Sequence, residues 1–446
     1  MTEAAAAPEF SPTAEPRRSW RDLVASTEID TRLFGMVLAL IVIWIGFHVM
    51  SHGAFLTSRN LWNLSVQSAS IAIMATGMVL IIVSRNIDLS VGSLLGFLGY
   101  TMAITQTDWL PHTFGLGLER PYTWLIALAV GIVLGAVIGA VQGYIVAYGG
   151  VPAFIVTLGG FLVWRGLIFR LGKKGQTLAP LDHNFQLLGG GPNGSLGEWK
   201  SWGLALVACV GIVLTLYMAR RRRQRYDLAL RPIGVDVGLG ILGCAAVIGA
   251  VGLIANRYIS PITHKPTGVA YPVVILIVVT LAMSYLAQRR RFGRYVYAYG
   301  GNPEAAELGG INTRKTITYT FVLMGVLCSL SAAVQTARLN AAVTNLGVQN
   351  ELDVIAAAVI GGTSFSGGIG TIPGAVLGAV IMQSLRSGMV LLRIDSPSQD
   401  IVVGVVLVTA VTVDAMLRLR RRSGVAGALL TGIIVSAVVI QTGRGH

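Results

Sequence analysis

The sequence predicts an all-α polytopic membrane protein with about 10–13 transmembrane helices, some of them broken or re-entrant. Apolar residues make up 54% of the 446-residue chain. Apolar runs of about 20 residues, each long enough to cross a bilayer core, recur from Leu33 to Gln441. Only helices and closed barrels satisfy their backbone in lipid, and the alternating pattern of a membrane barrel is absent. Helices are therefore the expected spanning elements.

The basic residues favour a membrane topology and not nucleic-acid binding. The formal net charge is +14, but the arginines come in clusters at the ends of apolar runs. Under the positive-inside rule such clusters mark cytoplasmic loops. The clusters are Arg17, Arg18 and Arg21; Arg220 to Arg223 with Arg225; Arg289 to Arg291 with Arg294; and Arg418 with Arg420 to Arg422.

The chain divides into three parts. Residues 1–32 are expected to form a cytoplasmic N-terminal tail, whose first residues lack the basic region and apolar core of a cleaved signal. Residues 33–417 form the transmembrane domain. Residues 418–446 hold a basic cluster and an extra apolar segment, Val425 to Gln441, which would leave the C-terminus outside.

Apolar length and flanking polar residues define the expected spans in order. The span 124–148 carries glycines at four-residue spacing, which exposes backbone along one face and predicts close packing against another helix of the same protein. The expected spans are 33–50, 64–83, 94–105, 124–148, 153–171, 202–219, 233–254, 271–286, 317–334, 356–374, 370–392 (which overlaps the preceding one) and 400–417.

A polar motif, Ser84 to Ser93 (SRNIDLSVGS), interrupts some of the longest apolar sequence. One interpretation is a tight turn in which Asp88 caps the helix that follows. The other is a broken helix beside a translocation path, because ionisable groups at membrane depth are costly and tend to serve function. The two interpretations are compatible, and both remain open.

A second interruption lies at Ala356 to Gly374, which ends in glycine, serine and threonine. Its apolar part is too short for a comfortable span. Non-helical backbone at membrane depth survives only where protein or a water-filled cavity covers it. We therefore expect a discontinuous crossing here.

The polar stretch Tyr299 to Ile311 (YGGNPEAAELGGI) follows a basic run and so is expected in the cytoplasm. Asn302 can N-cap a short helix, Pro303 suits its first position, and Glu304 is stabilised there by the helix dipole. Such a helix either binds a cytoplasmic partner or is an ordinary capped connector. The small residues that let a partner approach, or that end the turn, are Ala305, Ala306, Gly309 and Gly310.

Enzymatic chemistry finds no support in the sequence. Two G-x-G-x-x-G matches, at Gly189 and Gly238, lie outside any βαβ context, and no phosphate-binding G-x-x-x-x-G-K-[ST] loop is present. The six histidines have no metal-ligand spacing, and the three cysteines suggest neither a disulfide framework nor a metal site. We therefore expect no enzyme activity, no cofactor and no metal.

These motifs carry a resemblance to a known family. The stretch Glu304 to Gly310 (EAAELGG) resembles the E-A-A-x-x-x-G signature of permease subunits of ATP-binding-cassette (ABC) importers. Together with Ile87 to Ser93 and Glu351 to Gly368, it is similar to the ribose/xylose branch of the sugar permeases. The similarity covers about Phe55 to Leu417, and the segments 53–60 and 151–166 most resemble xylose-transporting members of that branch.

The resemblance implies a permease of the bacterial inner membrane that carries a monosaccharide, D-xylose. Its partners would be a second permease copy, a periplasmic sugar-binding protein, membrane lipid and an ATPase subunit that grips 303–310. From the residues alone, an ion-coupled secondary sugar symporter is an alternative. The resemblance places ATPase coupling at Asn302, Pro303, Glu304, Ala305, Ala306 and Gly310, and the translocation-path candidates are Asp88, Ser90, Thr363, Ser364 and Ser366.

Overall fold

A computed structural model describes residues 31–118, 120–172, 175–191, 193–228, 230–260 and 264–422. Within these ranges the chain is helical and forms isolated β-bridges but no strands. Nine of the described helices are long and apolar enough to cross a membrane. The predicted all-α polytopic class is therefore confirmed. Residues 1–30 of the expected tail and the extra segment Val425 to Gln441 lie outside the described residues.

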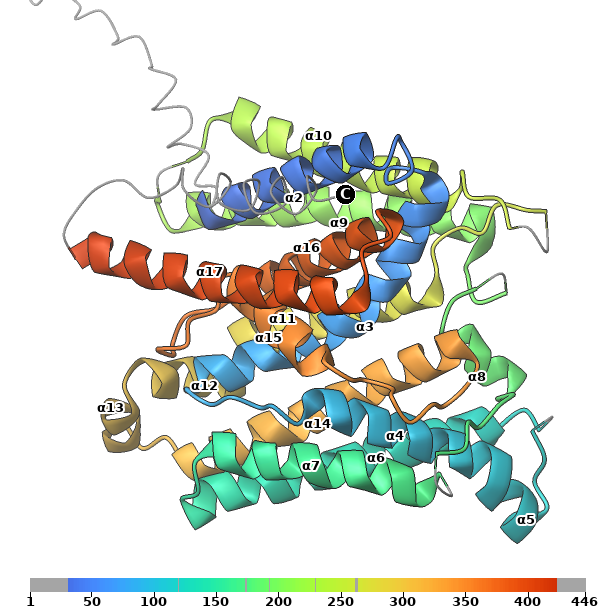
Figure 1. Cartoon of the computed structure of the whole chain (residues 1–446). Helices are drawn as coiled ribbons and strands as arrows, with labels where there is room; N and C mark the ends of the chain where they lie inside the picture. Colours follow the sequence, from blue (N-terminus) through green and yellow to red (C-terminus); the bar gives the residue numbers. More distant parts are fainter. Residues whose placement is uncertain are drawn as a thin grey trace, which may run out of the picture.

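The long helices run across the view of Figure 1 in roughly one direction. The nine are α2 (Thr31–Met50), α3 (Ser58–Val83), α6 (Thr123–Gly149), α7 (Ala153–Leu171), α9 (Gly197–Arg225), α10 (Ile233–Gly249, continued by the π-helix η2, Ala250–Ala255), α11 (Tyr271–Arg289), α14 (Thr313–Leu339) and α16 (Ile372–Leu391). The other elements are α4 (Val91–Ile104), η1 (Thr105–Trp109), α5 (Leu110–Phe114), α8 (His183–Leu187), α12 (Arg291–Gly301), α13 (Pro303–Leu308), α15 (Asn350–Ile360) and α17 (Ser396–Arg422), whose apolar part is 396–409.

Helix α3 forms the centre of the bundle, and 94% of its most apolar window is buried inside the protein. Helix α6 packs on α14 through the glycines that the sequence singled out. A Cβ on Gly139 would meet the carbonyl oxygen of Phe321, and one on Gly135 would meet that of Gly325. The predicted close packing is confirmed, because the two backbones leave no room for side chains there.

Two crossings are broken. Residues 86–90 are non-helical and lead into α4, and residues 340–349 lead into α15. With 11 residues, α15 spans about 16 Å, roughly half of a bilayer core. The two helix beginnings meet, since a Cβ on Gly92 would strike Glu351 and the Gly347 carbonyl.

The predicted interruption is present, because α15 ends at Ile360 and residues 361–371 are non-helical. We expected this run of glycine, serine and threonine at membrane depth. The structure places residues 361–371 at the end of α3, where the amide of Gly368 donates to the Val83 carbonyl oxygen. A second break lies earlier, at 340–349, where Arg165 of α7 donates to the carbonyl oxygens of Thr344 and Leu346.

One end of the bundle holds the helix ends and connections that carry the basic clusters within the described residues. Figure 1 shows α12, α13, the connection from α9 to α10 and the C-terminal end of α17 at the same side of the molecule. The last turn of α9 holds Arg222, Arg223 and Arg225. The positive-inside rule makes this side cytoplasmic.

Trp62 lies in α3 and is 5% exposed. Its Nε1 donates to the Gly268 carbonyl oxygen at 2.9 Å. The indole therefore fixes the segment before α11 to the bundle and does not face the lipid headgroups.

Candidate functional site

The short capped helix predicted after Asn302 is present as α13, Pro303–Leu308. The side-chain Oδ1 of Asn302 accepts from the Ala305 amide at 3.1 Å, which confirms the predicted N-cap. Pro303 occupies the first turn with Glu304, and Gly309 ends the helix. Gly310 has a φ of +78°, a conformation that suits glycine. Sequence rules for helix ends account for this whole element.

Helix α13 presents most of its surface outward. Only Ala306 is buried, at 5% exposure, and it faces the rest of the chain. Glu304 and Ala305 are exposed. Leu308 is 90% exposed, a side chain that sequence analysis did not single out. An apolar side chain left almost fully exposed on the cytoplasmic side is a candidate for contact with a partner protein. The sequence signal that could have identified Leu308 is its place between the acidic residues of α13 and the glycines that follow.

The motif before α4 is held by several helices. Oδ1 of Asp88 accepts from the amide and the hydroxyl of Ser90 at 2.8 and 2.7 Å. Gln142 on α6 donates from Nε2 to the Ser90 Oγ at 3.1 Å. Thr157 on α7 accepts from the Leu89 amide at 3.2 Å. Protein therefore covers this non-helical backbone, as membrane depth requires.

Asp88 does not cap α4 in the manner that the turn interpretation expected. The N-cap residue is Ser90, whose side chain makes no cap hydrogen bond. Asp88 lies two residues earlier and closes the turn on Ser90. Both side chains are almost fully buried, at 1% and 0% exposure. Gln142, which sequence analysis missed because it sits in a glycine-rich apolar span, joins these two path candidates to α6.

The other path candidates lie in the loop 361–371. The hydroxyls of Ser364 and Ser366 are 2.6 Å apart, and the Ser364 amide donates to the Ile369 carbonyl oxygen at 2.9 Å. Thr363 is 1% exposed, and its hydroxyl has no hydrogen-bond partner. The loop is thus a compact turn with internal hydrogen bonds.

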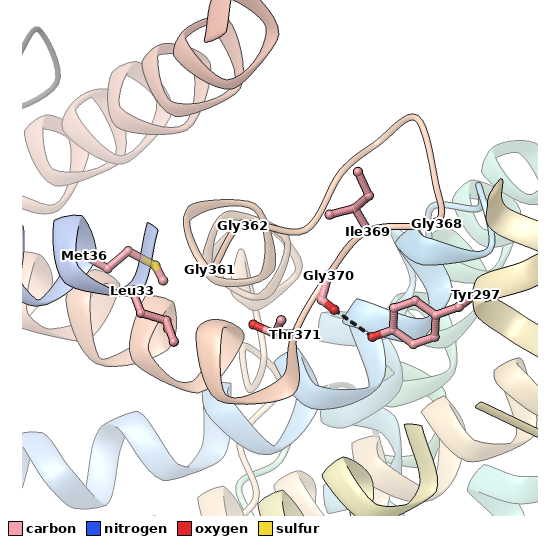
Figure 2. Close-up of a pocket in the computed structure, with 9 residues that line it drawn as sticks. All are labelled: Leu33, Met36, Tyr297, Gly361, Gly362, Gly368, Ile369, Gly370 and Thr371. Carbon is pink, nitrogen blue, oxygen red and sulfur yellow. Dashed lines mark hydrogen bonds between the residues drawn. The ribbon is translucent and has the colours of Figure 1, made fainter. Parts of the chain in front are cut away.

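A cavity of about 240 Å³ lies beside this loop. Figure 2 shows its wall, with Thr371 and the loop glycines facing Leu33 and Met36 of α2, and Tyr297 of α12 on the far side. The hydroxyl of Tyr297 donates to the Gly370 carbonyl oxygen at 2.7 Å. Burial raises the pKa of Tyr297 to about 12, so this donor stays protonated at ordinary pH.

Helix α13, the motif before α4 and the loop 361–371 meet through α12. Arg85, which follows α3, donates from Nε to the Gly300 carbonyl oxygen at 2.8 Å and from Nη2 to that of Gly301 at 2.9 Å. Those carbonyls end α12, and α13 begins at Pro303. Arg85 belongs to the motif predicted from the sequence but had no role there, and no sequence signal pointed to Tyr297. No local pattern predicts these contacts, because those of Arg85 join residues more than 200 positions apart and that of Tyr297 joins residues 73 positions apart.

A group of charged side chains near α15 was also missed. Arg386 of α16 pairs with Asp353, with Nε 2.8 Å from Oδ2, and lies 3.8 Å from Asp400 of α17. Arg165 of α7 donates to the carbonyl oxygens of Thr344 and Leu346 at 3.3 and 3.4 Å. The sequence signal that could have identified these charged side chains is an arginine within an apolar run. Among the described residues, no group of three or more His, Cys, Asp and Glu side chains is placed to hold a metal.

Comparison with known proteins gives a family match over most of the chain. Residues 60–411 match the family described as branched-chain amino acid transport system / permease component. No solved structure shows significant similarity to the chain.

Curated relatives include sugar permeases. The xylose transport system permease protein XylH of Haemophilus influenzae is 37% identical over 386 residues, which cover 86% of this chain and 96% of the relative. XylH of Escherichia coli K12 is 38% identical over 392 residues, covering 88% and 94%. The ribose import permease protein RbsC of Escherichia coli K12 is 34% identical over 360 residues, covering 81% and 87%.

Proposed function

We propose a substrate and a transport cycle for this chain, which belongs to the branched-chain amino acid transport system permease family and is a multi-pass, non-catalytic permease of the ABC sugar-importer type. Membership implies an ATPase and a binding protein as partners. The substrate that we propose is D-xylose. The support is the identity of 37–38% to xylose permeases over nearly their whole length, against 34% to a ribose permease.

In the proposed cycle two copies of the chain enclose the sugar pathway in the bacterial inner membrane. A periplasmic binding protein delivers the sugar to the outer face. ATP binding and hydrolysis on the partner subunits move α13, and the pathway opens alternately to each side. The coupling residues that we propose are Asn302, Pro303, Glu304, Ala305, Ala306 and Gly310, which form or flank α13.

The exposure of α13 is the observation that carries the coupling role. A connector between two spans needs only to be capped, and Asn302 satisfies that need. A connector has no need for a leucine, Leu308, that is 90% exposed beside the exposed Glu304. An apolar side chain next to a carboxylate at a helix end suits a groove on a partner, as in other helix-in-groove contacts.

The proposed pathway serves a neutral sugar, so hydroxyl and amide groups suit it. Asp88, Ser90, Thr363, Ser364 and Ser366 remain our candidates. Asp88, Ser90, Thr363 and Ser364 are nearly fully buried here, at 1%, 0%, 1% and 0% exposure. In the proposed cycle they reach the pathway only when the packed segments around them part.

Reconstitution tests this function. The tagged chain is purified from its native membrane with the partners that stay bound, and the complex is placed in liposomes with ATP inside and the binding protein outside. We expect uptake of labelled xylose that requires ATP and that unlabelled xylose suppresses more strongly than ribose. Uptake by the chain alone, driven by a sodium or proton gradient, would instead establish the symporter. Stronger suppression by ribose would refute the choice of sugar.

A further inference from the structure

Three cytoplasmic segments come together at the end of α3. They are the residues that follow α3, the end of α12, and the loop 361–371. We propose that this loop is the cytoplasmic gate of the pathway and that Arg85 and Tyr297 are positioning residues that tie the gate to the coupling helix α13. The inference rests on the proposed function, because it assigns a route by which movement of α13 reaches the pathway.

Arg85 provides the first connection. Its guanidinium makes two hydrogen bonds, at 2.8 and 2.9 Å, to the carbonyl oxygens of Gly300 and Gly301. A cation at a helix C-terminus satisfies carbonyls that have no partner in the helix and is favoured by the helix dipole. Arg85 itself has a φ of +60°, an uncommon conformation for a residue other than glycine. The end of α12 is thereby held to the end of α3.

Gly300 makes the contact close enough to transmit movement. A Cβ at this position would strike the Val83 carbonyl oxygen and would lie 2.6 Å from the Gly368 amide nitrogen. That amide donates to the same Val83 oxygen at 3.0 Å. Backbone therefore packs on backbone, and α12 cannot shift toward α3 without moving the loop.

Tyr297 provides the second connection. It lies on α12, one helical turn before Gly301, and its hydroxyl donates to the Gly370 carbonyl oxygen at 2.7 Å. Arg85 thus holds the C-terminal end of α12, next to α13, and Tyr297 of α12 holds the loop 361–371. A shift of α13 away from the membrane pulls α12, and α12 pulls the loop through Gly370.

The loop has the features of a part that moves as a unit. Its hydrogen bonds between Ser364 and Ser366 and between Ser364 and Ile369 are internal. Gly362, Gly367 and Gly368 have φ values of +88°, +85° and +72°, so glycine hinges lie at both ends of the turn. The cavity of about 240 Å³ beside it gives the loop space to enter (Figure 2).

A purely structural role for Arg85 and Tyr297 predicts a different outcome from a transmitting role. If the two residues only stabilise the fold, their loss lowers the amount of intact complex, and each remaining complex works normally. If they transmit movement, the complex assembles and hydrolyses ATP, but less sugar crosses for each ATP. The ratio of sugar imported to ATP hydrolysed separates the two roles.

The experiment compares Arg85→Gln, Arg85→Lys and Tyr297→Phe in the assembled complex in liposomes. Arg291→Gln is the matched control, because Arg291 is exposed on the same helix. ATP hydrolysis and uptake of labelled xylose are measured on the same preparation. We expect Tyr297→Phe to lower the sugar-to-ATP ratio about five-fold, the effect of losing one hydrogen bond. Arg85→Gln lowers it further, Arg85→Lys restores part of it, and Arg291→Gln leaves it unchanged.

The outcomes are distinct. A wild-type complex without ATP-dependent uptake overturns the proposed function, and the gate with it. A working wild type in which both Arg85→Gln and Tyr297→Phe keep the normal ratio overturns the gate alone. If Arg85→Gln does not assemble, Tyr297→Phe decides, because it removes a single oxygen atom and leaves the packing of α12 intact.

Discussion

Arg386 and Asp353 form an ion pair that holds the short helix α15 in the bundle. The Arg386 Nε lies 2.8 Å from Oδ2, and its Nη2 donates to Oδ1 at 2.9 Å. Asp353 is 2% exposed. Asp400 of α17 lies 3.8 Å from Nη1 and accepts from Gln349 at 2.9 Å. Arg386 of α16 thus neutralises the buried acid of α15, and Asp400 of α17 is a second carboxylate near the same guanidinium.

Removing Arg386 should therefore destabilise the protein. Arg386→Ala leaves the Asp353 carboxylate buried without its partner, which costs about 3–5 kcal/mol of the free energy of unfolding. The measurement is the unfolding temperature in detergent. The double variant Arg386→Met with Asp353→Leu removes both charges and should lose much less. Equal losses in the single and double variants would mean that packing, and not charge, explains the effect.

The glycine face of α6 leads to a second prediction. Gly139→Ala places a Cβ against the Phe321 carbonyl oxygen and should cost about 1–3 kcal/mol of stability through overpacking. Gly159→Ala on α7 is the control, because no atom lies within 4 Å of its Cβ position. There the loss of glycine should stabilise the helix by about 0.5–1 kcal/mol. Thermal unfolding of both variants in the same detergent checks the contrast, and a destabilised Gly159→Ala would contradict it.

Much of the fold could be predicted because membranes constrain it strongly. Apolar length gave the spans, and glycine spacing identified the face of α6 that meets α14. Local rules for helix ends placed α13 between Asn302 and Gly309. Each of these rests on residues close together in sequence, which is where single-sequence reasoning is strongest.

The relations between sites could not be predicted, because they join distant segments. Arg85 contacts Gly300, and Tyr297 contacts Gly370, without any periodic or capping pattern that pairs them. The packing of the loop 361–371 has a similar cause. A glycine-rich run signals that a helix stops, but not which distant segment the loop then contacts. In this chain the amide of Gly368 donates to the Val83 carbonyl oxygen at the end of α3.

Leu308 supplies a prediction about the coupling contact. Its side chain is 90% exposed, so Leu308→Ser removes little packing within this chain and should leave its unfolding temperature unchanged. If the ATPase buries the leucine, its loss costs about 1.5–3 kcal/mol, or a rise of about ten-fold or more in the dissociation constant. The measurement is binding of the purified ATPase subunit to the permease in detergent. Unchanged affinity would show that Leu308 lies outside the contact.

Glu304 supplies a charge test of the same contact. Glu304→Lys reverses the charge in the first turn of α13 and should abolish recovery of the ATPase and ATP-dependent uptake, while the protein stays in the membrane. Glu198→Lys is the control, because Glu198 is also exposed in the first turn of a helix, α9, at the opposite end of that helix from its arginine cluster. Co-purification from membranes measures recovery. Normal recovery with Glu304→Lys would exclude this residue from the ATPase contact.

Asp88 allows its turn and pathway roles to be separated. Asp88→Ala leaves the buried amide and hydroxyl of Ser90 without their acceptor, which costs about 1–3 kcal/mol for each group, so we expect poor folding. Asp88→Asn keeps an oxygen at the same position, and its stability should stay within about 1 kcal/mol of the wild type. Thermal unfolding measures that difference, and uptake of labelled xylose is then compared for the folded Asn variant. We expect reduced uptake, because the carboxylate lies in a segment that we place beside the pathway. Full uptake by a stable Asp88→Asn would confine Asp88 to holding the turn before α4.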